Sequence, residues 1–223
     1  MTVPIDTLVT WSPAPLSASD TIEDALGMVL EDGCEVLPVV GPDGILVGVV
    51  SEEVLLEADG PDSTLASVLH GFPVSIAPDA HVFEATKLMV QHDLTALPII
   101  DEGRRYLGFA RRRDIFERYA QMLATQEAGA IVTIEMEPRD FSLAKLVHTI
   151  EQNDVRILSV VTEPPSEASE SYVLTLKLNV QDASRVRHLL EHYGYQVIGS
   201  HGESETEEDL QDRVQAFMRY LDI

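Results

Sequence analysis

The pattern of apolar and polar residues near the start of the chain predicts an amphipathic helix. Its apolar residues recur at helical spacing, at Ile22, Ala25, Leu26, Val29 and Leu30. Asp20 is expected to cap the N-terminus, with Glu23 as its capping-box partner, and Gly33 is expected to close the C-terminus. These signals together place one helix between Asp20 and Gly33.

Two strands and a short helix are expected to follow. Residues 36–40 form a short apolar run containing Pro38, a residue that suits an edge strand or the start of a strand. Asp43-Gly44 is a hairpin turn signal, and residues 45–50 supply the returning strand. A helix over residues 52–58 completes the unit.

The same order of elements recurs 60 residues later. A shift of 60 positions aligns identical residues, namely Pro13, Ala25, Leu37, Pro38 and Gly48 with Pro73, Ala85, Leu97, Pro98 and Gly108. The second copy predicts a helix capped by Asp79, strands over 96–100 and 106–110, and a helix from Arg113. Because a unit of about 60 residues buries little core by itself, the copies 1–60 and 61–120 are expected to pack as one pseudo-symmetric module.

A different pattern begins after a helical connector expected over residues 121–130. Within a second domain, 131–202, the alternation predicts strands over 131–136, 155–161, 172–180 and 195–200. Helices are expected over 141–150 and from the cap Asp182 to Gly194, the latter with Val186, Leu189, Leu190 and Tyr193 as its buried face. The last segment, 203–223, is an acidic linker and an amphipathic C-terminal helix that packs on its own module or on a partner.

Composition indicates a soluble cytoplasmic protein. Apolar residues make up 45% of the 223 residues, but no run approaches the roughly 20 that a membrane helix needs. Residues 1–6 lack the basic and apolar regions of a signal peptide. The lone Cys34 excludes an internal disulfide framework and any zinc site with several cysteines.

The charge of the chain is strongly negative. Its 38 acidic and 15 basic side chains give a formal net charge of −23, and only three of the basic residues are lysine. Surfaces of this kind suit a high-salt cytoplasm, although an ordinary acidic bacterial protein remains an equal alternative. In either case the chain is a poor candidate for coating nucleic acid or an anionic membrane.

The doubled helix-strand-Pro-turn-strand-Gly signature resembles a tandem pair of CBS domains, also called a Bateman module. The matching residues are Ala25, Leu37, Pro38, Gly48 and Ser51 in the first copy and Ala85, Leu97, Pro98, Gly108 and Asp114 in the second. In that family a Gly-h-h-Thr/Ser-x-x-Asp segment, with h apolar, lines a cleft that binds adenosine ligands. Its hydroxyl contacts phosphate and its aspartate accepts hydrogen bonds from the ribose.

Each copy keeps one of these two binding residues. The first copy has Ser51 but Val54 in place of the aspartate, and the second has Asp114 but Arg111 in place of the hydroxyl residue. An arginine can bind phosphate bidentately. The resemblance therefore implies a site in the second cleft, with Asp114 on ribose, Arg111 on phosphate, and Ile76 and Pro98 as apolar walls. The alternative is that Asp114 only caps the final helix and Arg111 pairs with a surface carboxylate.

A cationic segment surrounds these residues. Residues 1–100 contain 16 acidic side chains and one basic one, whereas residues 101–118 contain six arginines and four acids. Such an island suits an anionic ligand, and an ion-paired dimer surface is an equally weighted interpretation.

The order βαββαβ in the second domain resembles an ACT domain, a ferredoxin-like sandwich that often senses amino acids. Phe141 stands where that family usually has a ligand-admitting glycine, which favours a structural or dimerising role. The whole arrangement resembles the acetoin-utilisation AcuB-like proteins of bacteria.

One catalytic pattern is present but rejected. His188-Leu189-Leu190-Glu191-His192 matches the H-x-x-E-H pattern of zinc peptidases, yet the helix phase places both histidines opposite the apolar face. No catalytic or metal-binding residue is therefore expected, and the fold is α+β.

The sequence predicts a regulatory protein without enzymatic activity, which is a homodimer and binds a nucleotide ligand. Expected ligands are AMP, ADP, ATP or S-adenosylmethionine, with no resident cofactor. The alternative function is a structural or protein-interaction module whose clefts are vestigial.

Overall fold

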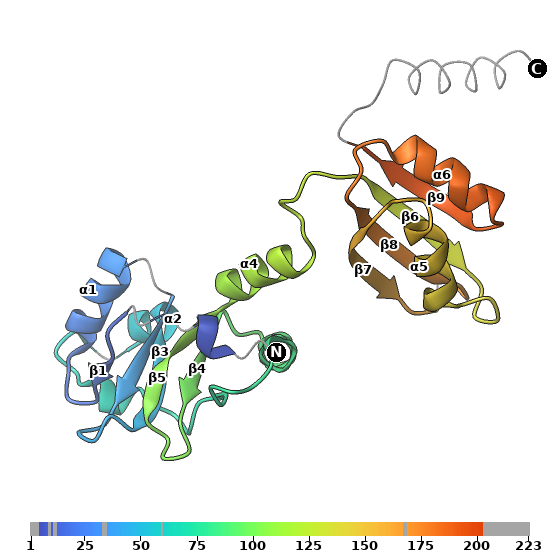
Figure 1. Cartoon of the computed structure of the whole chain (residues 1–223). Helices are drawn as coiled ribbons and strands as arrows, with labels where there is room; N and C mark the ends of the chain where they lie inside the picture. Colours follow the sequence, from blue (N-terminus) through green and yellow to red (C-terminus); the bar gives the residue numbers. More distant parts are fainter. Residues whose placement is uncertain are drawn as a thin grey trace, which may run out of the picture. The chain divides into compact units, whose positions relative to one another are not determined.

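The chain forms two units, Met1–Glu117 and Arg118–Ile223. The structure is a computed structural model (Figure 1), and it describes residues 5–8, 10, 13–32, 35–58, 60–166 and 169–202. No helix in these ranges is both long and apolar enough to span a lipid bilayer.

The first unit contains the expected order of elements twice. The first copy consists of η1 (Ile5–Leu8), β1 (Leu16–Ser17), α1 (Ile22–Asp32), β2 (Val36–Val40), β3 (Leu46–Ser51) and α2 (Glu52–Leu56). The second consists of η2 (Leu65–Ser67), α3 (Val82–His92), β4 (Ala96–Ile100), β5 (Tyr106–Arg111) and α4 (Arg112–Met122). The mixed α+β architecture and the repeat are confirmed.

The two hairpins have the same register. Val36 pairs with Ser51 in the first, and Ala96 pairs with Arg111 at the positions 60 residues later. Each hairpin also has its irregularity between the fourth and fifth residue of its first strand. The repeat found in the sequence is therefore also present in the structure.

Each copy extends its leading segment onto the other copy. Ile5 N–H donates to the carbonyl of Ala80 at 3.0 Å, and Leu65 N–H donates to the carbonyl of Asp20 at 2.9 Å. Ile5 and Leu65 are both fully buried. Because each copy completes its neighbour's core, the pair forms one module, as the small size of each copy requires.

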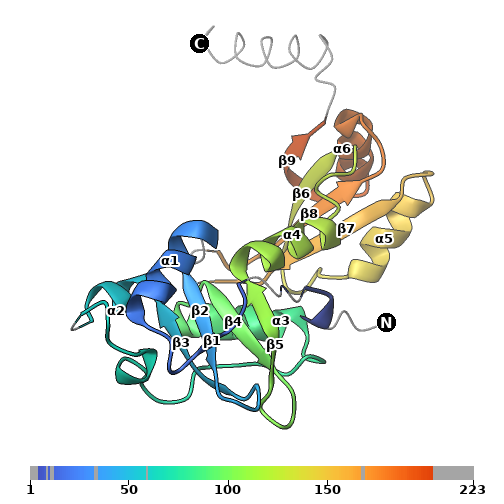
Figure 2. The same ribbon diagram turned by 90° about the vertical axis from the view of Figure 1, so that its left-hand side faces the viewer.

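The hairpins also join at the centre of the module, where they lie side by side (Figure 2). Leu46 N–H donates to the carbonyl of Arg104, and Tyr106 N–H donates to the carbonyl of Gly44, both at 3.0 Å. A cluster of buried side chains fills the space between the copies, with Leu46, Tyr106 and Phe109 at its centre.

The helix caps differ from the sequence prediction. Thr21 rather than Asp20 forms the capping box of α1, because its hydroxyl accepts from Asp24 N–H at 3.1 Å and its own N–H donates to the Asp24 carboxylate at 3.3 Å. The carboxylate of Asp20 instead accepts from Ser17 N–H at 2.7 Å. The Thr21 hydroxyl also donates to the Asp24 carboxylate at 2.7 Å, and this bond together with the one from Thr21 N–H holds the pKa of Asp24 below its ordinary value of 3.8.

The cap of α3 is likewise displaced from Asp79. His81 occupies the N-cap position, and its Nδ1 accepts from Phe83 N–H at 3.2 Å. The expected closing residue of α1, Gly33, lies outside the described residues.

The helical connector expected over 121–130 is not continuous. Helix α4 ends at Met122, and the backbone then turns, with Ala124 in the left-handed region at φ 51°. Thr125 N–H bonds back to the carbonyl of Ala120 at 3.0 Å, which closes the helix. Residues 128–130 are not helical, and Gly129 has a positive φ of 155°.

The second unit contains the expected βαββαβ order. Its elements are β6 (Ile131–Met136), α5 (Leu143–Glu151), β7 (Ile157–Glu163), β8 (Tyr172–Leu178), α6 (Ala183–His192) and β9 (Gln196–His201). The strands form one antiparallel sheet in the order β7-β8-β6-β9, which is the ferredoxin-like topology. Residues 203–223, including the expected C-terminal helix, lie outside the described residues.

One core lies between this sheet and its two helices. Val132, Ile134 and Met136 alternate inward on β6, and α5 and α6 cover that face with buried residues that include Leu146, Ile150, Val186 and Leu190. Asp182 caps α6 as predicted, by accepting from Ser184 N–H at 2.9 Å. Tyr193, expected in the core, is 52% exposed because the helix has ended and Gly194 turns the chain at φ 83°.

Candidate functional site

A cleft of about 440 Å³ opens between the two copies of the first unit. Its lining residues come from both copies and are Pro13, Glu35, Val36, Thr95, Ala96, Phe109, Arg111, Arg112 and Arg113. The pairs Glu35-Val36 and Thr95-Ala96 are equivalent under the 60-residue repeat. The cleft therefore opens where the first residues of the two equivalent strands β2 and β4 meet.

Backbone hydrogen bonds fix the wall that carries the arginines. Arg112 N–H donates to the carbonyl of Thr95 at 2.8 Å, which ties the start of α4 to the start of β4. The equivalent bond in the first copy runs from Glu52 N–H to the carbonyl of Glu35 at 3.3 Å. Since Arg111 ends β5 and Arg112 begins α4, their positions follow from this strand-to-helix junction.

Arg112 and Arg113 each bind a nearby carboxylate. The Arg112 guanidinium donates to the carbonyl of Leu94 at 2.8 and 3.2 Å and to the Asp93 carboxylate at 3.2 Å. Arg113 donates from Nε to Glu117 at 3.2 Å. Three arginines therefore line the cleft, two of them ion-paired with Asp93 and Glu117, and Glu35 is the single carboxylate among the lining residues.

Asp114 contacts a segment far away in the sequence. Its Oδ2 accepts a hydrogen bond from the hydroxyl of Thr10 at 3.1 Å, and both side chains are partly buried. Thr10 is itself paired with Phe109 through two backbone hydrogen bonds of 2.9 and 3.1 Å. The Asp114 carboxylate therefore has a hydrogen-bond partner outside α4.

Ser51, which the repeat places at the position of Arg111, caps a helix. Its hydroxyl accepts from Val54 N–H at 3.3 Å at the start of α2. Neither Ser51 nor Asp114 belongs to the lining of the 440 Å³ cleft.

Ile76 and Pro98 lie next to each other but do not line this cleft. Ile76 N–H donates to the carbonyl of Pro98 at 2.9 Å, and Ile76 is 5% exposed. Pro98 lies in the middle of β4, whereas the cleft opens at the first residue of that strand. The apolar walls are instead Pro13, Val36, Ala96 and Phe109.

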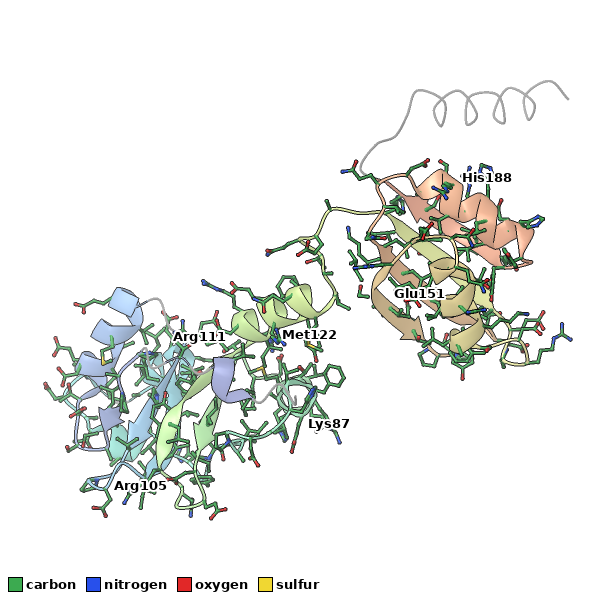
Figure 3. All side chains as sticks on the ribbon, viewed as in Figure 1. Lys87, Arg105, Arg111, Met122, Glu151 and His188 are labelled. Atoms are coloured by element: carbon green, nitrogen blue, oxygen red, sulfur yellow. The ribbon has the colours of Figure 1, made fainter. Side chains whose placement is uncertain are left out.

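The cationic segment is divided by the fold. Arg104 and Arg105 lie in the turn before β5, and Arg111 lies at the other end of that strand (Figure 3). The Arg104 guanidinium stacks on the ring of Phe72 at 3.8 Å. A six-residue strand spans about 20 Å, so these two groups belong to separate sites.

Phe141, His188 and His192 lie in the second unit. Phe141 packs against Tyr172, with ring centroids 4.3 Å apart. His188 and His192 are both exposed on α6. Among the described residues, no group of three or more His, Cys, Asp or Glu side chains is arranged to hold a metal ion.

Comparison with curated proteins gives partial matches to larger enzymes. The chain is 27% identical over 132 residues to inosine-5'-monophosphate dehydrogenase of Korarchaeum cryptofilum, covering 58% of this chain and 28% of that protein. It is 30% identical over 113 residues to homoserine O-acetyltransferase of Methanococcoides burtonii, covering 48% of this chain and 22% of that protein. The chain thus corresponds to less than a third of either relative.

Solved structures match over about half of the chain. The Vibrio cholerae protein AcuB, assigned to acetoin utilization, has a TM-score of 0.51 at 24% identity and covers 56% of this chain and 96% of its own. A CBS domain pair/ACT domain protein of Thermotoga maritima has a TM-score of 0.50 at 23% identity and covers 54% and 99%. CBSX2 in complex with AMP has a TM-score of 0.50 at 21% identity and covers 53% and 96%.

The family model for the CBS domain matches residues 5–60 and again residues 66–121, which together make up half of the chain. These two matches coincide with the structural repeat and with the copies that enclose the cleft. The chain therefore belongs to the CBS domain family.

Proposed function

We propose that this chain is a regulatory protein whose CBS pair binds an adenosine nucleotide in the cleft between the two copies. The observation that carries this proposal is the composition of the cleft, where Arg111, Arg112 and Arg113 line one wall in a chain of net charge −23. Concentrated positive charge inside a strongly negative protein favours an anionic ligand.

The size and the walls of the cleft suit a nucleotide. Small-molecule sites commonly have volumes of about 300–1,000 Å³ and combine apolar walls with a few polar groups. At about 440 Å³, the cleft offers Val36, Ala96 and Phe109 for a base and the arginines for phosphate. The fold neighbour CBSX2 was solved with AMP, which supports this ligand class.

Asp114 is the proposed ribose acceptor. Thr10 engages one of its carboxylate oxygens, and a carboxylate can accept further hydrogen bonds at the other oxygen. Asp114 does not line the cleft itself, but it lies on the first turn of α4, directly after the three arginines that do. Bound ribose would therefore join the helix, the N-terminal segment and the ligand in one network.

Regulation follows from the shared walls of the cleft. A ligand that contacts Glu35 or Val36 from one copy and Arg111 from the other has a different affinity for each relative arrangement of the copies. Binding then shifts the population toward the arrangement that it fits best. The ferredoxin-like second unit, which we assign to the ACT type, is the proposed recipient of this signal.

We assign no enzymatic activity and a cytoplasmic location to the chain.

Thermal unfolding of the purified chain with AMP, ADP, ATP and S-adenosylmethionine tests the proposal. A ligand at 100 times its dissociation constant stabilises the folded state by about 2.7 kcal/mol. Arg111→Ala and Asp114→Ala should abolish the increase in melting temperature. Arg105→Ala, which removes the same charge at the opposite end of β5, should retain it. The absence of an increase with all four ligands would exclude nucleotide sensing.

Exposed apolar side chains favour a second candidate function, self-association. Leu30 on α1 and Val90 on α3 are 81% and 75% exposed, and Leu56 and Phe116 are 68% and 72% exposed. Both pairs are equivalent under the repeat, so the apolar surface follows the pseudo-symmetry of the module. Paired exposed apolar residues suit a homodimer interface. Sedimentation of Phe116→Glu against the wild-type chain tests this, because the variant should be monomeric.

A further inference from the structure

A second concave site lies in the other unit, at a position that the proposed nucleotide site does not involve. It is a groove of about 290 Å³ between α6 and the segment that joins α5 to β7. Its floor is apolar and consists of Val155, Val186 and Leu189, of which Val155 and Val186 are 3% and 1% exposed. The remaining lining residues are all polar, namely Asn153, Arg185, His188 and His192.

The polar residues of α6 form one stripe along the groove. At 3.6 residues per turn, Arg185, His188 and His192 fall within about 60° of one another around the helix axis. Figure 3 marks His188 on this helix. Arg187 and Glu191 lie outside that sector and do not line the groove.

These positions around the helix separate the glutamate of the H-x-x-E-H pattern from its two histidines. The zinc-peptidase mechanism needs the glutamate and both histidines around one metal ion. Here both histidines line the groove together with Arg185, which carries a fixed positive charge. Glu191 does not line the groove. An arginine in place of a carboxylate makes the groove unsuitable for a cation and suitable for an anion.

The absence of acidic residues from the groove is notable for this chain. Acidic side chains outnumber basic ones by 38 to 15 overall, yet none belongs to the lining. No ion pair within the described residues involves Arg185. The Asn153 side chain is held in place because its Nδ2 donates to the carbonyl of Thr149 at 2.9 Å.

We infer that this groove binds a small oxyanion with an apolar body, of the carboxylate or phosphate ester class. The guanidinium of Arg185 would hold two oxygens of the anion, because its planar fork matches carboxylate and phosphate geometry. The ring nitrogens of His188 and His192 supply further hydrogen-bond donors, and the apolar body packs on Val155 and Val186. The groove lies away from the loop 137–142, where Phe141 blocks the position expected for an ACT ligand.

Nuclear magnetic resonance of the full chain tests this inference, with the side-chain signals of His188 and His192 as the readout. Three probes separate the contributions: inorganic phosphate, 3-methylbutanoate, and the neutral 3-methylbutan-1-ol. Both anions should shift the histidine signals in a saturable way, and the alcohol should not. Tighter binding of 3-methylbutanoate than of phosphate would assign a role to the apolar floor, and the reverse order would identify a phosphoryl ligand.

Matched variants on the same helix complete the test. Arg185→Gln should weaken anion binding at least tenfold, whereas Arg187→Gln should change it less than twofold. Arg111→Ala, in the other unit, should leave these shifts intact, which distinguishes this site from the nucleotide cleft. Equal effects of Arg185→Gln and Arg187→Gln, or equal shifts with the neutral alcohol, would overturn the inference.

Discussion

The hydroxyl of Thr10 donates a hydrogen bond to Oδ2 of Asp114 at 3.1 Å, across 104 positions of the sequence. Thr10 lies in a segment that leads into the first copy, and Asp114 belongs to the last helix of the second. The contact therefore links the start of the module to the residue proposed to bind ribose.

Thr10→Val is expected to weaken nucleotide binding by roughly three- to tenfold, where tenfold corresponds to about 1.4 kcal/mol. Without the hydroxyl, the Asp114 carboxylate is no longer held in one orientation. The free energy of unfolding should fall by only about 0.5–1.5 kcal/mol, the usual worth of one hydrogen bond. Calorimetric titration with AMP and ATP measures the first effect. Thr10→Ser, which keeps the hydroxyl, should bind as the wild-type chain does, and an equal loss in both variants would contradict this role.

Glu35→Gln is expected to strengthen nucleotide binding. Glu35 is the carboxylate that lines the cleft opposite the arginines, so its removal reduces repulsion of phosphate groups. Near a surface such a charge is worth roughly 1 kcal/mol or less, which corresponds to at most about fivefold in affinity for AMP. ATP carries more charge and should gain more. Glu52→Gln removes an exposed carboxylate outside this cleft and serves as the control. A decrease in affinity for Glu35→Gln would show that Glu35 binds the ligand.

Gly129→Ala should destabilise the second unit. Gly129 has φ 155°, and an added Cβ would lie 1.9 Å from the carbonyl oxygen of Leu178. The strained backbone alone costs about 1–3 kcal/mol, and the collision adds to it because the main chain must move. Gly194→Ala is the control, since Gly194 also has positive φ but no atom within 4 Å of the added Cβ. Urea unfolding should give a clearly larger loss for Gly129→Ala, and equal losses would argue against the close approach to Leu178.

Asp24 should contribute a pH-dependent part of the stability of the first unit. Hydrogen bonds from Thr21 lower the pKa of its carboxyl in the folded state from the ordinary value of 3.8. Because the folded pKa is the lower one, this stabilisation is fully present above the unfolded pKa and is lost as pH falls through the folded pKa. Asp24→Asn should therefore lower the urea midpoint at pH 7, by an amount that shrinks towards pH 3. Glu23→Gln, on the neighbouring residue, should have little effect at either pH.

Salt is expected to stabilise the chain. The net charge of −23 produces self-repulsion that ions screen. The ion pairs recorded among the described residues have side chains that are 55–97% exposed, so their screening costs little. The free energy of unfolding should rise with KCl, and a continued rise above 1 M would support adaptation to high salt. Full stability in dilute buffer would favour an ordinary acidic protein.

The sequence by itself determined the order of elements and their repeat. The strands over 36–40, 96–100 and 131–136 were predicted with their observed bounds, because alternation and turn signals act within a few residues. The helix caps were less predictable, because Asp20 and Thr21 are both suitable N-cap residues for α1. In the structure Asp20 accepts a hydrogen bond from Ser17 N–H, and Thr21 forms the cap.

Only the tertiary structure decided which side chains meet. It joined Thr10 to Asp114, opened a cleft at Glu35 and Arg111, and separated Arg105 from Arg111 by the length of a strand. It also brought Arg185 and His188 of α6 together with Asn153 and Val155 in one groove, whose lining does not include Glu191. The reason is physical: periodicity reports the face on which a residue lies, whereas a site depends on contacts between segments that are distant in the chain.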